Sequence, residues 1–123
     1  MKQSLGVGII VGDDKKTIKS CLESVDEVAD QIVVAIQTDT SEETINEIKA
    51  GSKKAEIHQF GDWTDDFACK RNFSFSKVTS DWCLWLDSDD ICYQPENLRF
   101  LIDNVEDKVG AIWLPYHYAV DEF

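Results

Sequence analysis

Hydrophobic residues along the chain form two alternating patterns, apolar runs and stretches with helical spacing. The apolar runs, which are typical of strands, cover residues 5–11, 31–36, 55–60, 81–86 and 109–118. Between them, apolar residues recur at intervals of three and four, which predicts helices, the first through Ile18, Cys21, Leu22 and Val25. Alternating strands and helices predict an α/β fold with a Rossmann-like, mostly parallel sheet and helices on both faces.

Local signals mark where three of the later helices begin. Thr40 and Glu43 have the spacing of a capping box before a helix that ends at Gly51. Another helix is predicted over residues 64–77, with its first residue as the N-cap. Pro95 suits the first turn of a further helix. The apolar stripe of that helix is predicted to comprise Leu98, Leu101, Ile102 and Val105.

The densest chemical signal is the segment Leu84-Trp85-Leu86-Asp87-Ser88-Asp89-Asp90, in which an apolar run leads directly into a group of carboxylates. Residues 81–86 predict a strand buried on both faces, so the carboxylates follow its carboxyl end, where open α/β sheets bind ligands. Clustered anions repel one another, and we therefore expect Mg²⁺ or Mn²⁺ here, with a phosphate-bearing substrate completing its shell. The alternative is a solvated acidic turn that caps the following helix.

Polar residues also follow the other predicted strands. They lie in the turn Gly12-Asp13-Asp14, in residues 37–39 and in residues 61–66. Because the carboxyl ends of parallel strands share one edge of the sheet, these loops predict a common ligand site. Each polar residue has a structural alternative: helix N-terminal turns for Asp13, Asp14 and Asp66, a residue preceding a cap for Asp39, a hydrophobic staple for Trp63, and core packing for His58 and His117.

Arg71 is predicted to lie on the buried face of its helix. Phe67, Arg71 and Phe75 are spaced four residues apart and share one side, which two aromatic residues identify as the inner side. A buried guanidinium needs a partner. That partner is either the carboxylates after residue 86 or the diphosphate of a ligand, and both interpretations hold if Arg71 changes partner when a nucleotide binds.

Composition limits the classes of function. The 123 residues, 43% of them hydrophobic, fit one globular domain, and the net charge of −12 argues against nucleic-acid binding. No apolar run approaches the roughly 20 residues of a membrane span, and residues 1–4 show no signal peptide, so we expect a cytoplasmic location. The cysteines lack C-x-x-C spacing and predict buried free thiols: Cys21, Cys69, Cys83 and Cys92.

Four segments together carry a family resemblance: Asp66-Phe67-Ala68-Cys69-Lys70-Arg71-Asn72, the segment from Asp81 to Asp89, the turn Gly12-Asp13-Asp14, and Cys21-Leu22-Glu23-Ser24-Val25. With them the chain resembles the amino-terminal, nucleotide-binding half of family 2 glycosyltransferases, inverting enzymes of GT-A fold. The resemblance runs from Leu5 to about Tyr118.

The resemblance implies a role for particular residues. Asp87 and Asp89 would hold a divalent ion, Mn²⁺ or Mg²⁺, that bridges the two phosphates of a nucleotide sugar. Arg71 would approach the diphosphate, while Asp66 and residues after the first two strands would contact the base and ribose. The predicted substrate-binding residues are Gly12, Asp39, Asp66, Arg71, Asp87 and Ser88. The implied reaction is sugar transfer to an acceptor hydroxyl with inversion.

The sequence departs from the family pattern in three respects. Asp39 comes one or two positions after the usual acidic residue, and Gly12-Asp13-Asp14 stands where Asn followed by Glu is common. The family's general base lies in a later acceptor-binding segment, which we expect the single domain 1–123 to lack. No catalytic base is assigned, and Asp121 and Glu122 are not given that role. The domain is expected to be part of a longer enzyme, to be completed by oligomerisation, or to bind a donor with only slow hydrolysis.

A two-component receiver domain is the alternative from a different class. Receivers have a similar length, bind Mg²⁺ and would accept phosphate on Asp87. However, Asp87 follows the fourth predicted strand rather than the third, and Leu114, instead of lysine, precedes Pro115. We therefore favour the glycosyltransferase interpretation.

Overall fold

The computed structural model describes residues 3–12, 14–60 and 67–115, which form four strands and four helices. In chain order these are β1 (Leu5–Val11), α1 (Ile18–Asp26), β2 (Gln31–Gln37), α2 (Glu42–Gly51), β3 (Ala55–Phe60), α3 (Phe67–Ser76), β4 (Trp82–Trp85) and α4 (Pro95–Asn104). The strand-helix alternation predicted from the sequence is confirmed through α4.

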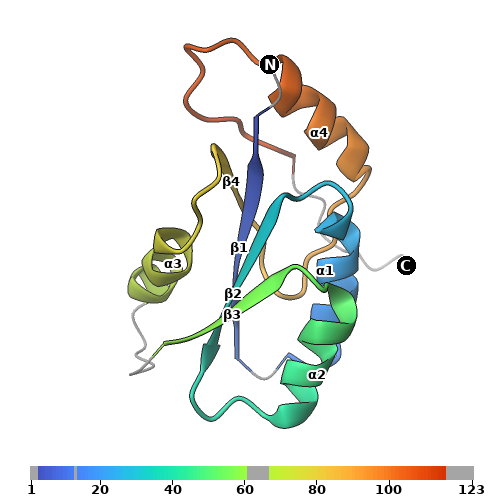
Figure 1. Cartoon of the computed structure of the whole chain (residues 1–123), viewed down its shortest axis with the longest axis vertical. Helices are drawn as coiled ribbons and strands as arrows, with labels where there is room; N and C mark the ends of the chain where they lie inside the picture. The colour runs from blue at the N-terminus through green and yellow to red at the C-terminus, as the bar shows by residue number, and fades with distance from the viewer. Residues whose placement is uncertain (1–2, 13, 61–66, 116–123) are drawn as a thin grey trace, which may run out of the picture.

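The four strands form one parallel sheet in the order β3-β2-β1-β4 (Figure 1). This is the order of the first half of a Rossmann sheet, in which the chain moves outward from β1 and then returns to its other side. The direction in which strands are added therefore reverses between β1 and β4, which makes this the topological switch point of the sheet. The loops that follow these two strands are neighbours there. The predicted fold class is confirmed.

Helices cover both faces of the sheet, with α3 on one side and α1 and α2 on the other (Figure 1). Alternate residues of β1 separate the two faces. Val7, Ile9 and Val11 are fully buried in the core that includes α1 and β2. Gly8 faces α3, where a Cβ atom would lie 2.9 Å from Phe75 Cδ1. The missing side chain thus lets α3 pack close to the sheet.

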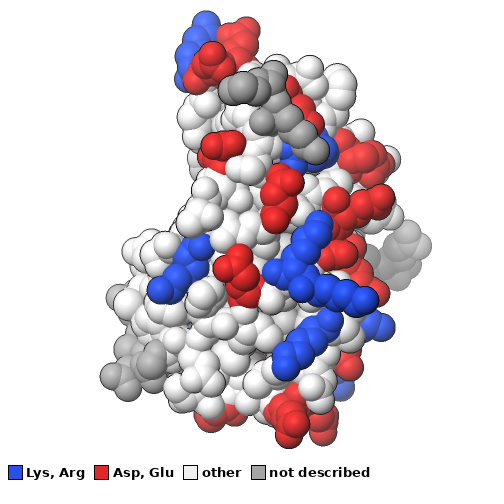
Figure 2. Space-filling view, in the orientation of Figure 1, with Lys and Arg blue, Asp and Glu red and all other residues white. Residues whose placement is uncertain are grey.

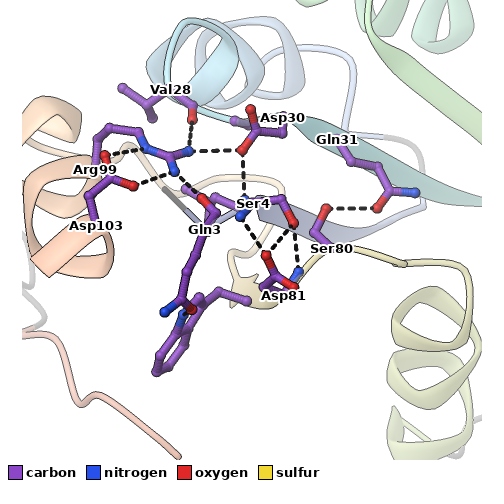
Figure 3. A network of polar contacts seen from close by, with 12 residues as sticks. Gln3, Ser4, Val28, Asp30, Gln31, Ser80, Asp81, Arg99 and Asp103 are labelled. Atoms are coloured by element: carbon purple, nitrogen blue, oxygen red, sulfur yellow. Dashed lines mark hydrogen bonds and ion pairs between the residues drawn. The ribbon is translucent and has the colours of Figure 1, made fainter. Parts of the chain in front are cut away.

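A polar network joins α4 to the amino-terminal edge of the sheet (Figure 3). Arg99 forms ion pairs with Asp30 at 2.9 Å and with Asp103 at 2.7 Å, and it also donates to the main-chain oxygens of Gln3 and Val28. Asp30 accepts a further hydrogen bond from the backbone N–H of Leu5. This network fixes the sheet at the edge opposite the loops expected to bind a ligand.

The prediction that residues 81–86 form a strand buried on both faces is wrong. β4 is shorter, its residues alternate in burial, and Trp85 is 58% exposed. The strand pairs with β1. The last predicted strand, over residues 109–118, is not a strand over residues 109–115, and residues 116–118 lie outside the described part. An apolar pattern does not by itself supply the hydrogen-bonding partner that a strand needs.

The predicted capping box at Thr40 and Glu43 is also wrong, by one residue. Ser41 is the N-cap of α2 and accepts a hydrogen bond from the backbone N–H of Thr44 at 3.3 Å. The hydroxyl of Thr40 is engaged elsewhere, because it accepts from the N–H of Gln37 and donates to the carbonyl of Gly12. The predicted end of the helix at Gly51 is confirmed.

Two burial predictions hold only in part. In α4, Pro95 occupies the first turn and Leu98 and Ile102 are buried, but Leu101 is 39% exposed and Val105 follows the helix. All four cysteines are free, as predicted, yet Cys69 and Cys83 are exposed and only Cys21 is fully buried.

Within the described residues, no helix has both the length and the apolar character to cross a membrane.

Candidate functional site

A cavity of about 260 Å³ lies at the carboxyl edge of the sheet. Its walls come from the end of β1 and the turn after it, from the first part of α3, and from the loop after β4. The lining residues are Ile10, Gly12, Asp14, Lys70, Arg71, Asp87, Ser88 and Asp89. The structure therefore brings together four of the six predicted substrate-binding residues and both predicted metal ligands.

Arg71 forms the centre of one wall. Its side chain is 6% exposed, and Nη2 makes an ion pair with Oδ1 of Asp87 at 2.7 Å. Nη1 donates to the carbonyl of Gly8 at 3.3 Å, and the guanidinium lies 4.5 Å from the ring centroid of Trp85. Burial lowers the pKa of Arg71 while Asp87 opposes that change, and an arginine remains charged in proteins. The predicted pairing with carboxylates after residue 86 is confirmed.

The loop after β4 is a tight turn stabilised by its own acidic residues. The backbone N–H of Asp87 donates to Oδ2 of Asp90 at 3.1 Å, and the N–H of Asp90 donates back to the carbonyl of Asp87 at 3.0 Å. Asp87, Asp89 and Asp90 each offer one carboxylate oxygen, and these atoms lie within 4.8 Å of one another. Hard oxygen donors at this spacing fit Mg²⁺ or Mn²⁺.

Asp14 connects the two neighbouring loops. Its Oδ2 accepts a hydrogen bond from Ser88 Oγ at 2.7 Å and one from the N–H of Gly12 at 3.4 Å. Its carbonyl oxygen accepts from Thr17 and Ile18, so Asp14 also forms the turn that starts α1. Both sequence interpretations of Asp14 therefore apply together, since it is a helix-turn residue and a wall of the cavity.

Two residues of the site have roles that the sequence analysis did not predict. Lys70 lines the cavity beside Arg71, and its place in the Lys70-Arg71-Asn72 motif was the available signal. Cys21 of α1 contacts the loop after β4, where its Sγ donates a hydrogen bond to the carbonyl of Asp87 at 3.3 Å. Burial, followed by the negative charges of Asp90, Asp89 and Asp87, raises the pKa of Cys21 to about 12. The thiol of Cys21 therefore stays uncharged and stabilises the loop through its hydrogen bond to Asp87.

The cationic lining stands out against an acidic protein. The net charge is −12, and acidic side chains are spread over much of the face shown in Figure 2, while Lys and Arg gather mainly over α1 and α2. An anionic ligand approaching this protein therefore needs local positive charge. Lys70 and Arg71 are the basic side chains among the residues that line the cavity.

Of the remaining predicted residues, those that the structure describes do not line the cavity. Asp39 is exposed in the turn after β2, and its neighbour Thr40 contacts Gly12, so the turn lies near the cavity without lining it. His58 lies in β3, 3.8 Å from Glu56 and away from the lining residues. Asp13, Trp63, Asp66 and His117, as well as the side chain of Phe67, lie outside the described part.

Sequence comparison relates the chain to glycosyltransferases. No family model matches it. The SPbeta prophage-derived glycosyltransferase SunS of Bacillus subtilis is 34% identical over 90 residues, which cover 73% of this chain and 21% of SunS. A TPR repeat-containing protein of Synechococcus elongatus is 30% identical over 120 residues, which cover 88% of this chain and 28% of that protein. The matched part of the chain thus spans only 21% and 28% of the length of these relatives.

Solved structures share the fold. S. aureus TarS 1–349 superimposes with a TM-score of 0.63 at 20% identity, covering 79% of this chain and 30% of TarS. Glucosyl-3-phosphoglycerate synthase from Mycobacterium tuberculosis, in complex with Mg²⁺ and uridine diphosphate, superimposes with a TM-score of 0.59 at 17% identity, covering 81% of this chain and 38% of that one. Sequence and fold together confirm that the chain resembles glycosyltransferases of GT-A fold, as its motifs predict.

Proposed function

We propose that this chain is the donor-binding part of a glycosyltransferase, which holds a nucleoside-diphosphate sugar together with a divalent cation. The observation that carries the proposal is the single cavity in which Arg71, Asp87 and Asp89 meet. The similarity to a glycosyltransferase in sequence supports it. So does the fold shared with a synthase whose structure contains Mg²⁺ and uridine diphosphate.

Asp87 and Asp89 are the proposed metal ligands, and Asp90 adds a third carboxylate within the same 4.8 Å group. The cation, when bound, would supply positive charge that stabilises a leaving diphosphate. Lys70 and Arg71 provide fixed positive charge in the wall of the same cavity. Such preorganised charge favours the developing negative charge of the leaving group without reorganisation at the moment of reaction.

The other substrate contacts remain predictions with different support. Gly12 and Ser88 line the cavity, and the absence of a side chain at Gly12 leaves space for a ligand beside the first loop. Asp39 lies in the adjacent turn, where it would suit a ribose hydroxyl. The contact of Asp66 with the base rests on the family resemblance. Inversion, the acceptor, the choice between Mg²⁺ and Mn²⁺, and a cytoplasmic location also stay predictions, and no general base is assigned.

The strand order argues against the receiver alternative. Doubly wound signalling domains of that type have the order 2-1-3-4-5, with the third strand directly beside the first. Here β4 occupies that position and β3 lies at the far edge beyond β2. Asp87 therefore follows the strand directly beside β1, as a receiver's acceptor does, but the sheet has an additional strand, β3, beyond β2, which the receiver order lacks.

The proposal is tested by a thermal-shift panel of nucleoside diphosphates and nucleotide sugars, with Mn²⁺ or with EDTA. We expect a raised melting temperature only when metal and diphosphate are both present, and a weaker shift in Asp89→Ala. Glu106→Ala, which removes an exposed carboxylate far along the chain from the site, is the control and should shift like the wild type. An equal shift in EDTA would contradict the role of the metal.

A further inference from the structure

The indole of Trp85 contacts both charged groups at the centre of the candidate site. Trp85 is the last residue of β4, and 58% of it is exposed. Its Nε1–H donates to Oδ1 of Asp87 at 3.1 Å, and its ring lies 4.5 Å from the guanidinium carbon of Arg71. The ring also packs edge-on against Phe75 of α3, with the ring centroids 6.4 Å apart. Trp85 therefore links the helix that carries Arg71 to the loop that carries Asp87.

Oδ1 of Asp87 receives donors from two different elements. Arg71 reaches it from α3 at 2.7 Å, and Trp85 reaches it from β4 at 3.1 Å. The second oxygen, Oδ2, takes part in neither contact. Two donors on one oxygen restrict rotation of the carboxylate about its Cβ–Cγ bond. The two donor side chains also contact each other, because the indole ring of Trp85 stacks against the guanidinium of Arg71.

We propose that Trp85 is a positioning residue for the divalent cation. Its N–H, together with Arg71, fixes the Asp87 carboxylate so that the remaining oxygen is presented to the cation alongside Asp89. This role rests on the proposed function, because it presupposes that Asp87 binds a metal. Hydrogen bonds to metal-ligating groups typically change metal affinity by about 10- to 100-fold, and we expect the single indole donor to fall at the lower end.

Two substitutions separate the N–H from the ring. Trp85→Phe keeps an aromatic ring against Arg71 but removes the donor, whereas Trp85→Leu removes both. Trp82→Phe is the matched control, because Trp82 lies in the same strand but donates its indole N–H to Gln3, at the opposite end of the sheet. The measurement is Mn²⁺ affinity of the whole chain, with the metal alone, from the electron paramagnetic resonance signal of free Mn²⁺.

We expect Trp85→Phe to weaken Mn²⁺ binding about 10-fold and Trp82→Phe to leave it unchanged. A second signal tests positioning directly: the indole N–H resonance of Trp85, identified by its loss in Trp85→Phe, should shift when Mg²⁺ is added. A purely structural tryptophan would show no such shift. Melting temperatures in EDTA confirm that each variant is folded.

The outcomes separate the two proposals. If the wild type binds Mn²⁺ and Trp85→Phe binds it equally well, the positioning role is overturned while the metal site stands. If only Trp85→Leu weakens binding, ring stacking on Arg71 is responsible and the proposed role of the N–H is overturned. If the wild type binds no Mn²⁺, the metal site itself fails and the role of Trp85 fails with it.

Discussion

Arg71 is the charged residue found in the buried interior of the described part of the chain. Burying a guanidinium costs free energy unless hydrogen bonds and an opposite charge compensate for it. Asp87, the carbonyl of Gly8 and the rings of Trp85 and Phe75 provide this compensation. The same contacts place a fixed positive charge in the cavity wall, next to that of Lys70.

Replacing Arg71 by alanine should therefore destabilise the protein. We expect a loss of about 2 kcal/mol in the free energy of unfolding, less than for a fully buried pair, because Asp87 stays half exposed and can be solvated. Urea unfolding in EDTA measures the change. Lys70→Ala, at the neighbouring position, is the control and should alter stability by no more than about 0.5 kcal/mol. An unchanged midpoint for Arg71→Ala would show that the pair contributes nothing to folding.

The Cys21 thiol should make stability depend on pH in the alkaline range. Its pKa is raised from 9.0 to about 12 in the folded protein, so above pH 9 the unfolded chain releases a proton that the folded chain retains. Unfolding then becomes easier as the pH rises towards the folded pKa. Linkage gives a loss of about 1 kcal/mol near pH 10 relative to about pH 8.

Cys21→Ala removes this contribution. In EDTA we expect the variant to be less stable than the wild type near pH 8, because packing is lost, and the difference to shrink by about 1 kcal/mol near pH 10. Cys69→Ala, which changes an exposed cysteine, should follow the wild type at both values. A difference that stays constant with pH would contradict the coupling.

At the scale of elements, the sequence was most informative where one segment determines its own structure. The continuous apolar run of β1 and the helical spacing in α1 predict those elements correctly, since each needs only a buried face. The burial of β4 was predicted wrongly because it depends on what lies beside the strand. The choice between Thr40 and Ser41 as a cap also failed locally, because it depends on the contact between Thr40 and the distant Gly12.

The candidate site likewise combines features that one segment determines with features that depend on contacts between side chains. The Asp87-Ser88-Asp89 motif and Arg71 were predicted, because strand ends and helix faces follow from spacing along the chain. The contacts of Trp85 and Cys21 were not, since they depend on the directions in which side chains point and, for Cys21, on a partner 66 residues away in the sequence. A sequence pattern therefore locates the edge of the sheet at which the candidate site lies, whereas the supporting contacts require the packed structure.

The close packing of α3 on β1 provides a test at this scale. Gly8→Ala would place a Cβ atom 2.9 Å from Cδ1 and 3.1 Å from Cε1 of Phe75, so the ring and α3 must move. We expect a loss of about 1–3 kcal/mol, the usual cost of an overpacked interior. Gly12→Ala, later in the same segment, meets its nearest atom at 3.8 Å and should change stability little. Urea unfolding of both variants decides whether this contact is as tight as the structure indicates.

The molecule combines a strong net negative charge with a local cluster of carboxylates at Asp87, Asp89 and Asp90. With 24 acidic and 12 basic residues, the folded chain repels itself, and salt should stabilise it by screening. General screening and binding at Asp87 and Asp89 would both raise the melting temperature when a divalent salt is added. They differ in that screening depends on ionic strength, whereas site binding depends on particular carboxylates.

Comparing MgCl₂ with NaCl at equal ionic strength should therefore separate the two effects. We expect both salts to raise the melting temperature, with a further increase for MgCl₂ that is absent from Asp89→Asn. The further increase should saturate with Mg²⁺ concentration, since ligand binding to the folded state contributes RT ln(1 + [L]/Kd). Glu106→Gln changes net charge by the same amount at an exposed position and should retain the full Mg²⁺ effect. If it loses as much as Asp89→Asn, the effect of Mg²⁺ reflects overall charge, and the carboxylates after β4 have no special affinity for the ion.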